Sequence, residues 1–226
     1  MEFTHRTYER GQTIAAIATP PGDGGVAIIR ISGKDAFLIA DQIVSKQLKS
    51  ADSHRAYLCS FQNGRKQVID KGLMMIFKAP HSYTGENIVE LHCHGGRLIT
   101  QKVLQASLDA GARGALPGEF TYQAFLNGKI DLSQAEAVQQ AIASESEAAL
   151  QAAETQLDGA LHEKIKHFQN SLLKQCAILE AWVDFPEEGL EFTTVEEMQT
   201  NLKKTFVEIQ ELLSTFSDGK RLNTTF

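Results

Sequence analysis

The sequence has few cysteines and no long apolar run, and both shortages exclude classes of protein. Its three cysteines, Cys59, Cys93 and Cys176, are odd in number and widely separated, unlike the disulfide framework of a small secreted domain. No apolar run approaches the roughly 18–20 residues of a membrane-spanning helix, and the start MEFTHRTYERGQ lacks the apolar stretch of a secretory signal. We therefore expect a cytoplasmic protein.

Phosphate-binding motifs are missing as well. The segment PPGDGG at residues 20–25 has closely spaced glycines, but it precedes a strand-like run and no Gly-Lys-Ser or Gly-Lys-Thr follows it. It therefore matches neither the P-loop nor the dinucleotide-binding fingerprint, and a tight connection is the simpler interpretation. Because no Walker A pattern occurs in the 226 residues, we expect that this chain does not hydrolyse GTP alone.

Charge is unevenly distributed along the chain, whose net charge is −6. Residues 1–120 carry 14 Lys and Arg against 11 Asp and Glu, a net of +3, whereas residues 121–226 carry 8 against 17, a net of −9. Nucleic-acid affinity depends largely on cations that neutralise phosphates. If RNA is the substrate, we expect the acidic second half to contribute little to holding it.

The first half alternates short strand-like runs with helix-like periods, which predicts an α+β fold. Asn63-Gly64 indicates a tight hairpin because both residues tolerate positive φ, and Pro117-Gly118 closes this part of the chain. The expected strands cover residues 12–19, 26–32, 55–61, 67–77 and 86–94, and the expected helices cover residues 34–44 and 95–111.

The second half has the apolar period of a long-helix bundle. Apolar residues recur every three or four positions from Leu157 to Val183, which predicts one helix ended by Pro186, and a second stripe covers residues 195–216. Residues 184–188 are the expected turn between the two helices. The helix start signals are Ser133-x-x-Glu136, Ser144-x-x-Glu147 and Thr193-x-x-Glu196. We divide the chain into an N-terminal mixed α/β domain, residues 1–120, and the first part of a helical domain, residues 121–226.

The sequence ends shortly after Asp218-Gly219, which indicates a helix end, and we interpret the chain as truncated. Two helices with apolar stripes cannot bury all of that surface against each other. We expect partner helices from the rest of a longer protein or from a second copy. The alternative is that the first domain covers the stripes.

The segment His92-Cys93-His94 suggests a metal site, because residues two apart on a strand share a face and imidazole binds zinc. A third ligand would have to come from a distant residue such as His81 or Cys59, without a ligand-spaced motif. The simpler interpretation is an ordinary strand end. Cys93 faces away from both histidines on a strand, which weakens the hypothesis of a Cys/His nucleophile.

Three charged residues are stronger candidates for a binding site. Arg30 interrupts the apolar run VAIIRIS and Glu90 interrupts NIVELHC, and a charge in such a strand needs a partner or a ligand. The two could also pair with each other or face solvent. Lys129 lies in a turn expected between two helices, where pairing with Asp131 is the alternative.

Four strings resemble the MnmE (TrmE) family of tRNA-modification GTPases in the same order and at similar spacing. They are TIAAIATPPGDGGVAIIRISG, HSYTGENIVELHCHGG, PGEFTYQAFLNGKIDLSQAEAV and DFPEE, and the similarity extends from about Thr13 to Leu222. The resemblance implies an N-terminal domain that is similar to the tetrahydrofolate-binding domain of one-carbon enzymes, binds 5-formyl-tetrahydrofolate and forms a homodimer. It also implies a helical domain, built from two chain segments, around an inserted GTPase domain.

The same resemblance implies a function for the full-length protein and roles for three residues. With a flavin-dependent partner, MnmG, in a heterotetramer, such a protein installs a carboxymethylaminomethyl-type group at C5 of the wobble uridine of tRNA, and it uses GTP, Mg²⁺ and K⁺. The folate-contacting arginine, glutamate and lysine of the family fall on Arg30, Glu90 and Lys129.

This chain also departs from the family pattern. Asp23 stands where family members often carry arginine, and His92-Cys93 stands where they often carry Gln-Gly. The electrostatics of the pocket therefore differ from those of such members. Two other functions stay open: a dimerisation or scaffold module without folate binding, and a metal-dependent hydrolase built around His92 and His94.

Overall fold

The structure, a computed structural model, describes residues 11–48, 51–185 and 193–224. It divides into two compact units, residues 1–130 and 131–226. The boundary between the units follows Ile130, whereas the sequence pattern changes after Phe120. Helix α3 (Glu119–Leu126) and the turn with Lys129 therefore belong to the first unit.

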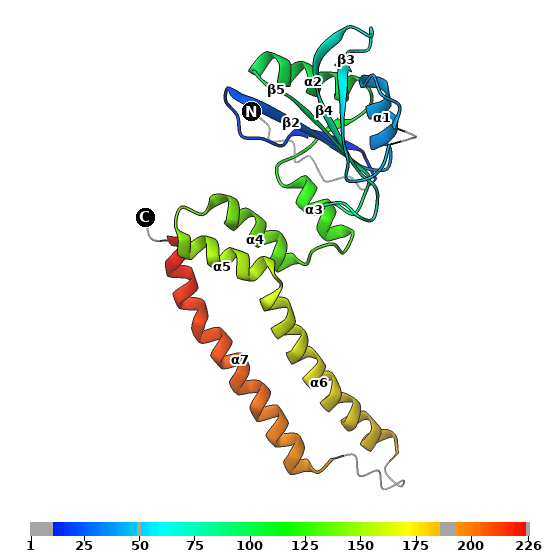
Figure 1. Ribbon diagram of the computed structural model, residues 1–226. Helices are drawn as coiled ribbons and strands as arrows, with labels where there is room; N and C mark the ends of the chain where they lie inside the picture. Colours follow the sequence, from blue (N-terminus) through cyan, green and yellow to red (C-terminus); the bar gives the residue numbers. More distant parts are fainter. Residues whose placement is uncertain (1–10, 49–50, 186–192, 225–226) are drawn as a thin grey trace, which may run out of the picture. The chain divides into compact units, whose positions relative to one another are not determined.

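The first unit contains a six-stranded mixed sheet with the strand order β3-β4-β5-β2-β1-β6 (Figure 1). β1 and β6 are parallel, and the other neighbouring strands are antiparallel. The strands are β1 (Ile14–Ile17), β2 (Gly24–Ser32), β3 (Ala56–Gln62), β4 (Val68–Phe77), β5 (Ile88–Gly95) and β6 (Arg113–Gly114). The α+β fold is confirmed, as are the five longer strands and the β3–β4 pairing.

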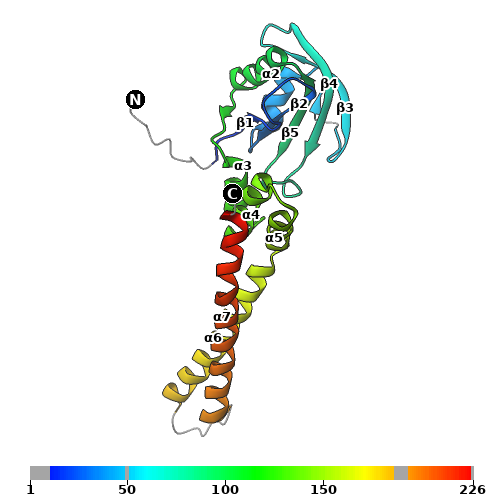
Figure 2. The same cartoon turned by 90° about the vertical axis from the view of Figure 1, so that its left-hand side faces the viewer.

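Helices α1 (Ala36–Ile43) and α2 (Arg97–Asp109) cover one face of this sheet (Figures 1 and 2). Because side chains alternate along a strand, every second residue of the central strands points toward these helices. The buried apolar cluster includes Ile29, Ile31, Met74, Ile76, Val89, Leu91, Ile39, Ile43 and Val103. The residues between them, Arg30 and Glu90 included, therefore lie on the other face.

The β3–β4 hairpin closes by a different turn from the one expected. The positive φ lies at Lys66, with φ 60°, rather than at Asn63 or Gly64. The Asn63 side chain contributes instead, since its Oδ1 accepts the backbone N–H groups of Arg65 and Gln67 at 3.0 Å each. These side-chain bonds add to the backbone bonds of the turn, in which the Lys66 N–H donates to the Asn63 carbonyl at 2.9 Å.

β4 and β5 approach each other closely at Gly72. A Cβ built on Gly72 would lie 2.0 Å from the carbonyl oxygen of His92, far inside van der Waals contact. Leu73, the next residue of β4, is the register partner of His92. Only glycine fits at position 72 with this spacing of the strands.

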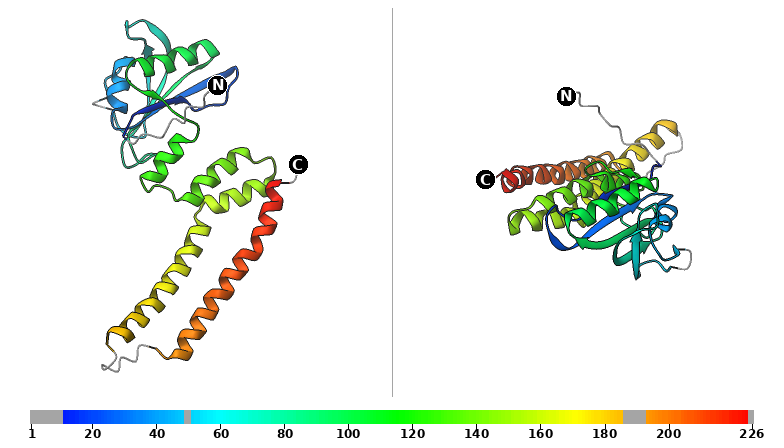
Figure 3. Two further views of the ribbon diagram at one scale, coloured as in Figure 1. Left: turned by 180° about the vertical axis from the view of Figure 1, so that it is seen from behind. Right: turned by 90° about the horizontal axis from the view of Figure 1, so that it is seen from above.

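Within its described residues, the second unit contains four helices. They are α4 (Leu132–Ala143), α5 (Glu147–Leu157), α6 (Ala160–Asp184) and α7 (Val195–Thr224). α4 packs along α5, and α6 lies beside α7 (Figure 3). The hydroxyls of Ser171 on α6 and Thr205 on α7 are 2.8 Å apart. Over the described residues, no helix combines the length and the apolar character needed to cross a membrane.

The long apolar stripe does not belong to one helix, so that prediction was wrong. Gly159 adopts φ 83° and separates α5, which ends at Leu157, from α6. The spacing of apolar residues in the sequence continues across this break and therefore did not reveal it. α6 ends at Asp184 and the other residues of the expected turn, 186–188, lie outside the described residues. α7 continues past Gly219 to Thr224, so the expected helix end at Asp218-Gly219 was also wrong.

The helix starts use other capping residues than those expected. Asp131 caps α4 and accepts the N–H of Gln134, and the Gln134 side chain completes the capping box. Ser146 caps α5. At α7 the reciprocal bonds join Thr194 and Glu197, at 3.1 and 3.2 Å, one residue later than expected.

Candidate functional site

Arg30 and Glu90 lie opposite each other on β2 and β5. Nε and Nη2 of Arg30 are 2.8 and 2.7 Å from Oε1 of Glu90. The two side chains are 26% and 12% exposed, so the pair is partly open to solvent. Of the alternatives considered from the sequence, the structure therefore shows the one in which Arg30 and Glu90 pair with each other. A charge-assisted contact of this kind also leaves lone pairs of the carboxylate for a further donor.

Two aromatic rings flank the Arg30 guanidinium. Its Cζ lies 5.6 Å from the ring centroid of Tyr83 and 5.5 Å from that of Phe120, within the range of cation–π attraction. Tyr83 is fixed in turn by a 2.9 Å hydrogen bond between its hydroxyl and that of Thr121 on α3. The aromatic contacts and Glu90 together hold Arg30 in one place.

The two histidines of the candidate metal motif bind different carboxylates. His92 Nε2 is 3.4 Å from Oε2 of Glu90, whereas Nδ1 of His94 is 2.8 Å from Oδ1 of Asp70. The backbone N–H of His94 also donates to Asp70. No three His, Cys, Asp or Glu side chains gather around one point within the ranges that the structure covers. Each imidazole therefore has its own acidic partner.

Two pKa values near these histidines are shifted. Burial raises the pKa of Asp70, but hydrogen bonds from the backbone and ring of His94 and from the Lys71 backbone outweigh burial and leave it below its ordinary value. Burial first, and then the charge of Asp70, raise the pKa of the Cys93 thiol. Cys93 lies on the core face and is buried, which makes it a poor nucleophile.

The segment between β4 and β5 is anchored to β2 and to α3. The buried hydroxyl of Thr84 lies 2.8 Å from that of Ser32, and Ser32 donates to Oε1 of Gln123 at 3.0 Å. Asn127, after α3, donates its side-chain N–H to the carbonyl of Thr84 at 2.7 Å. These bonds fix the loop that carries Tyr83 beside Arg30.

Lys129 contacts the same loop from the turn after α3. Its Nζ donates to the carbonyl of Pro80 at 3.1 Å, and a Cβ built on Gly85 would lie 3.0 Å from its Cγ. The alternative partner, Asp131, instead caps α4 and pairs with His162 in the second unit. Across the described ranges no hydrogen bond or ion pair joins Lys129 to Arg30 or Glu90. The loop of residues 80–87 contacts both sides: its Pro80 accepts from Lys129, and its Tyr83 lies beside Arg30.

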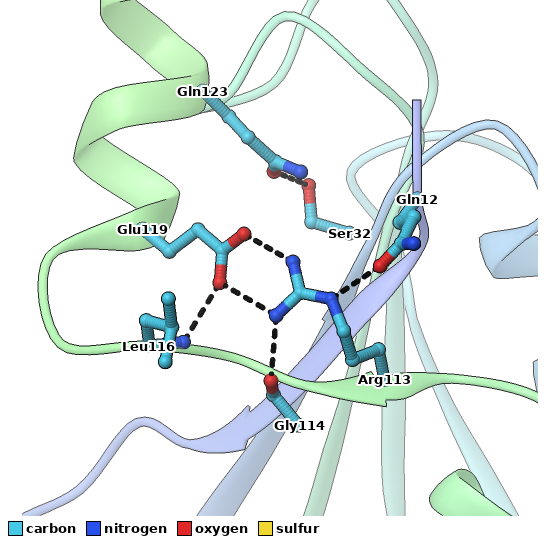
Figure 4. Close-up of polar contacts among 7 residues, drawn as sticks. All are labelled: Gln12, Ser32, Arg113, Gly114, Leu116, Glu119 and Gln123. Carbon is cyan, nitrogen blue, oxygen red and sulfur yellow. Dashed lines mark hydrogen bonds and ion pairs between the residues drawn. The ribbon is translucent and has the colours of Figure 1, made fainter. Parts of the chain in front are cut away.

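A buried ion pair at the start of α3 was missed by the sequence analysis. Both carboxylate oxygens of Glu119 accept from the guanidinium of Arg113, and Oε2 also accepts the Leu116 N–H at 2.7 Å (Figure 4). Arg113 further donates to Gln12 and to the carbonyl of Gly114. Because Phe120 follows Glu119, this network helps to place a ring that flanks Arg30. The sequence feature that points to this contact is the position of Glu119, an acid in the first turn of a helix.

Glu86, in the loop between β4 and β5, was also missed. Its Oε2 is buried and has no hydrogen-bond partner within the described structure, and burial raises the pKa of this carboxyl group. An unsatisfied buried acceptor is costly unless a donor reaches it. Glu86 is therefore a further polar group that a ligand could satisfy.

A separate cleft of about 790 Å³ lies in the first unit, beside the connection between β1 and β2. Its lining includes Pro20, Pro21, Asp23, Arg97 and Gln101, and it does not include Arg30, Glu90 or Lys129. The PPGDGG segment thus forms the loop between two antiparallel strands and one wall of this cleft.

Comparison with known proteins assigns both units. The profile of the family described as GTP-binding protein TrmE N-terminus matches residues 13–129, and that described as MnmE helical domain matches residues 132–224. A tRNA modification GTPase MnmE of Protochlamydia amoebophila is 54% identical over 223 residues, 99% of this chain and 49% of that protein. Two proteins of the same name are each 43% identical over 213 residues. The match covers 94% of this chain and 47% of the Chlamydia felis protein, and 93% of this chain and 47% of the Geobacter metallireducens protein.

The chain spans about half the length of the curated relatives it matches. The two profile matches together account for nearly all of its residues and follow its two structural units. The chain therefore belongs to the MnmE (TrmE) family, of which it carries the N-terminal and helical regions.

Proposed function

We propose that this chain is the N-terminal part of a tRNA modification GTPase, and that its first unit binds a one-carbon folate of the 5-formyl-tetrahydrofolate type. Arg30, Glu90 and Lys129 are the proposed contacts. The observation that carries this proposal is the partly exposed Arg30–Glu90 pair on the sheet face that α1 and α2 leave uncovered. Membership of the family supports the choice of ligand.

The chemistry of these residues fits a folate. A pterin presents a ring N–H and an exocyclic amine side by side, and a carboxylate such as Glu90 can accept both in a two-pronged bond. Arg30 and Lys129 are suited to the carbonyl or carboxylate oxygens of the ligand. The Tyr83 ring, 38% exposed, offers an apolar surface next to the guanidinium. The unsatisfied Oε2 of Glu86 provides one more acceptor in the same loop.

The residues of the proposed site have different roles. The aromatic rings of Tyr83 and Phe120 orient Arg30, and Arg30 in turn orients Glu90. Lys129 holds the loop of residues 80–87 through Pro80 and can exchange that carbonyl for a ligand oxygen. The folate, when bound, supplies the one-carbon unit.

The activity of the full-length protein is a proposal that extends beyond this chain. In this proposal, the full-length protein acts in the cytoplasm with an MnmG-type flavin partner, in a heterotetramer. Together they introduce a carboxymethylaminomethyl-type group at C5 of the wobble uridine of tRNA. In the same proposal, GTP, Mg²⁺ and K⁺ bind to the part of the full-length protein beyond these 226 residues, and we expect that this chain alone does not hydrolyse GTP.

Assembly is the other part of the proposal. The first unit forms a homodimer, and the second unit packs against further helices of the longer protein. Large apolar side chains of α6 and α7 are exposed, which supports the need for such partners. They include Leu173, Val183, Phe206 and Leu213.

Calorimetric titration with 5-formyl-tetrahydrofolate tests the site. We expect wild-type chain to bind, and Arg30→Ala, Glu90→Ala and Lys129→Ala each to weaken binding by about 10-fold or more, since each removes a charge-assisted hydrogen bond. Arg65→Ala, on the β3–β4 hairpin, is the matched control for loss of a cation. Three wild-type affinities would refute the site. A dimer without any folate affinity would favour the scaffold function.

A further inference from the structure

We infer that His92 is a positioning residue of the proposed folate site, and that its imidazole fixes the orientation of the Glu90 carboxylate. This inference rests on the proposed function and adds a residue to it. His92 makes its contact with Glu90 through Nε2 and Oε2, at 3.4 Å. It acts on the ligand only through Glu90.

The two oxygens of Glu90 contact different residues. Oε1 accepts from Nε and Nη2 of Arg30, and Oε2 faces Nε2 of His92. The terminal torsion of a glutamate is broad, so a contact at one oxygen leaves the plane of the carboxylate free to turn. A second donor at the other oxygen removes that freedom. Preorganised acceptors bind a planar donor pair more tightly because less order is lost on binding.

The contacts also leave room for a ligand. Each carboxylate oxygen has two acceptor sites: the two N–H groups of Arg30 occupy those of Oε1, whereas Oε2 keeps one site free, so a two-pronged pterin contact requires one Arg30 N–H to move off Oε1. His92 uses one site on Oε2, and the side chain of Glu90 stays 12% exposed. An ionised carboxylate can only accept, so the His92 tautomer that makes this contact carries its proton on Nε2.

The surroundings of His92 direct its imidazole toward Glu90. Its register partners are Ile28 on β2 and Leu73 on β4, and both are apolar. His94, two residues further along β5, is bound to Asp70 instead. Within the described ranges, the polar contact that His92 makes is with the Glu90 carboxylate, two residues before it and on the same side of the strand.

Two substitutions separate positioning from simple packing. His92→Leu fills similar space between Ile28 and Leu73 but donates nothing, whereas His92→Gln keeps an N–H donor. We expect His92→Leu to weaken binding of 5-formyl-tetrahydrofolate by about 5-fold or more, because a Glu90 carboxylate that is free to turn loses more order on binding, and His92→Gln to restore most of the affinity. His94→Leu is the control, because its partner is Asp70.

Calorimetry on the whole chain measures the folate affinity of each variant and so tests the positioning role of His92. The melting temperature of each variant shows whether it is folded. Wild-type affinity in His92→Leu, or a His92→Gln variant as weak as His92→Leu, would overturn the positioning role. If the wild type itself does not bind the folate, the proposed function fails and the role of His92 falls with it.

Long-range proton–nitrogen NMR of the imidazoles tests the contact without any ligand. We expect the Nε2–H form of His92 in the wild type and a changed nitrogen shift in Glu90→Gln. An unchanged spectrum in Glu90→Gln would show that His92 does not interact with Glu90 and would overturn the inference even if the folate binds.

Discussion

The guanidinium of Arg113 binds both carboxylate oxygens of Glu119 at the start of α3, and the Glu119 side chain is only 3% exposed. A carboxylate so deeply buried is tolerated only because its charge is paired and its oxygens have donors. The pair therefore fastens α3, with the ring of Phe120, to the loop that precedes it.

Removing one member of this pair should strongly destabilise the folded protein. We predict that Glu119→Ala lowers the free energy of unfolding by about 3–5 kcal/mol, because Arg113 and the Leu116 N–H lose their acceptor. Glu119→Gln keeps an acceptor for Leu116 and should cost less. Urea denaturation measures both, and hydrogen exchange of α3 shows where the loss acts. A Glu119→Ala variant within about 0.5 kcal/mol of the wild type would contradict a structural role for the pair.

The Arg30–Glu90 pair should show energetic coupling that an exposed pair lacks. We predict that a double-mutant cycle with Arg30→Met and Glu90→Gln gives a coupling of about 1–2 kcal/mol, because the side chains are mostly buried and in contact. Arg55 and Asp52, which are 70% and 65% exposed, form the matched control pair, with an expected coupling of about 0.5 kcal/mol or less. Equal coupling in the two cycles would contradict the prediction.

The Asp70–His94 contact should make stability depend on pH in the acid range. The pKa of Asp70 is lowered in the folded protein, so this carboxylate contributes stability above the pKa of the unfolded chain and loses it as pH falls through the folded value. We predict that Asp70→Asn is less stable than wild type at pH 7 and that the difference shrinks below about pH 4.

Denaturation curves between pH 2 and 7 measure this difference, and Asp23→Asn controls for the change in net charge. A difference between Asp70→Asn and the wild type that stays constant through the acid range would show that the contact does not depend on ionised Asp70.

Much of the fold could be predicted from sequence because its signals are local. β-branched runs between proline and glycine clusters marked the strands, and the apolar period marked the helices. The helix starts were predicted less well because neighbouring residues compete as caps. Thr193 and Thr194 have the same chemistry, and Asp131 lies next to the Ser133 signal; tertiary packing decides between them.

The candidate site required information that sequence does not contain. Arg30 and Glu90 were singled out as charges in apolar strands, yet their pairing depends on β5 lying beside β2 although α1, β3 and β4 separate them in the chain. The register of a sheet is set by the whole buried face. The role of Glu119 was missed for a similar reason, since nothing local reveals that this acid is buried.

The narrow gap at Gly72 limits how this protein can vary. A methyl group at position 72 would overlap the carbonyl oxygen of His92, so even the smallest chiral amino acid is incompatible with the present spacing of β4 and β5. Any lineage that replaced Gly72 would have to shift β4 along β5 or bulge it outward, which would move Leu73 away from His92. Which residues position 72 tolerates thus also affects the position of Leu73 beside His92, on the opposite side of the sheet.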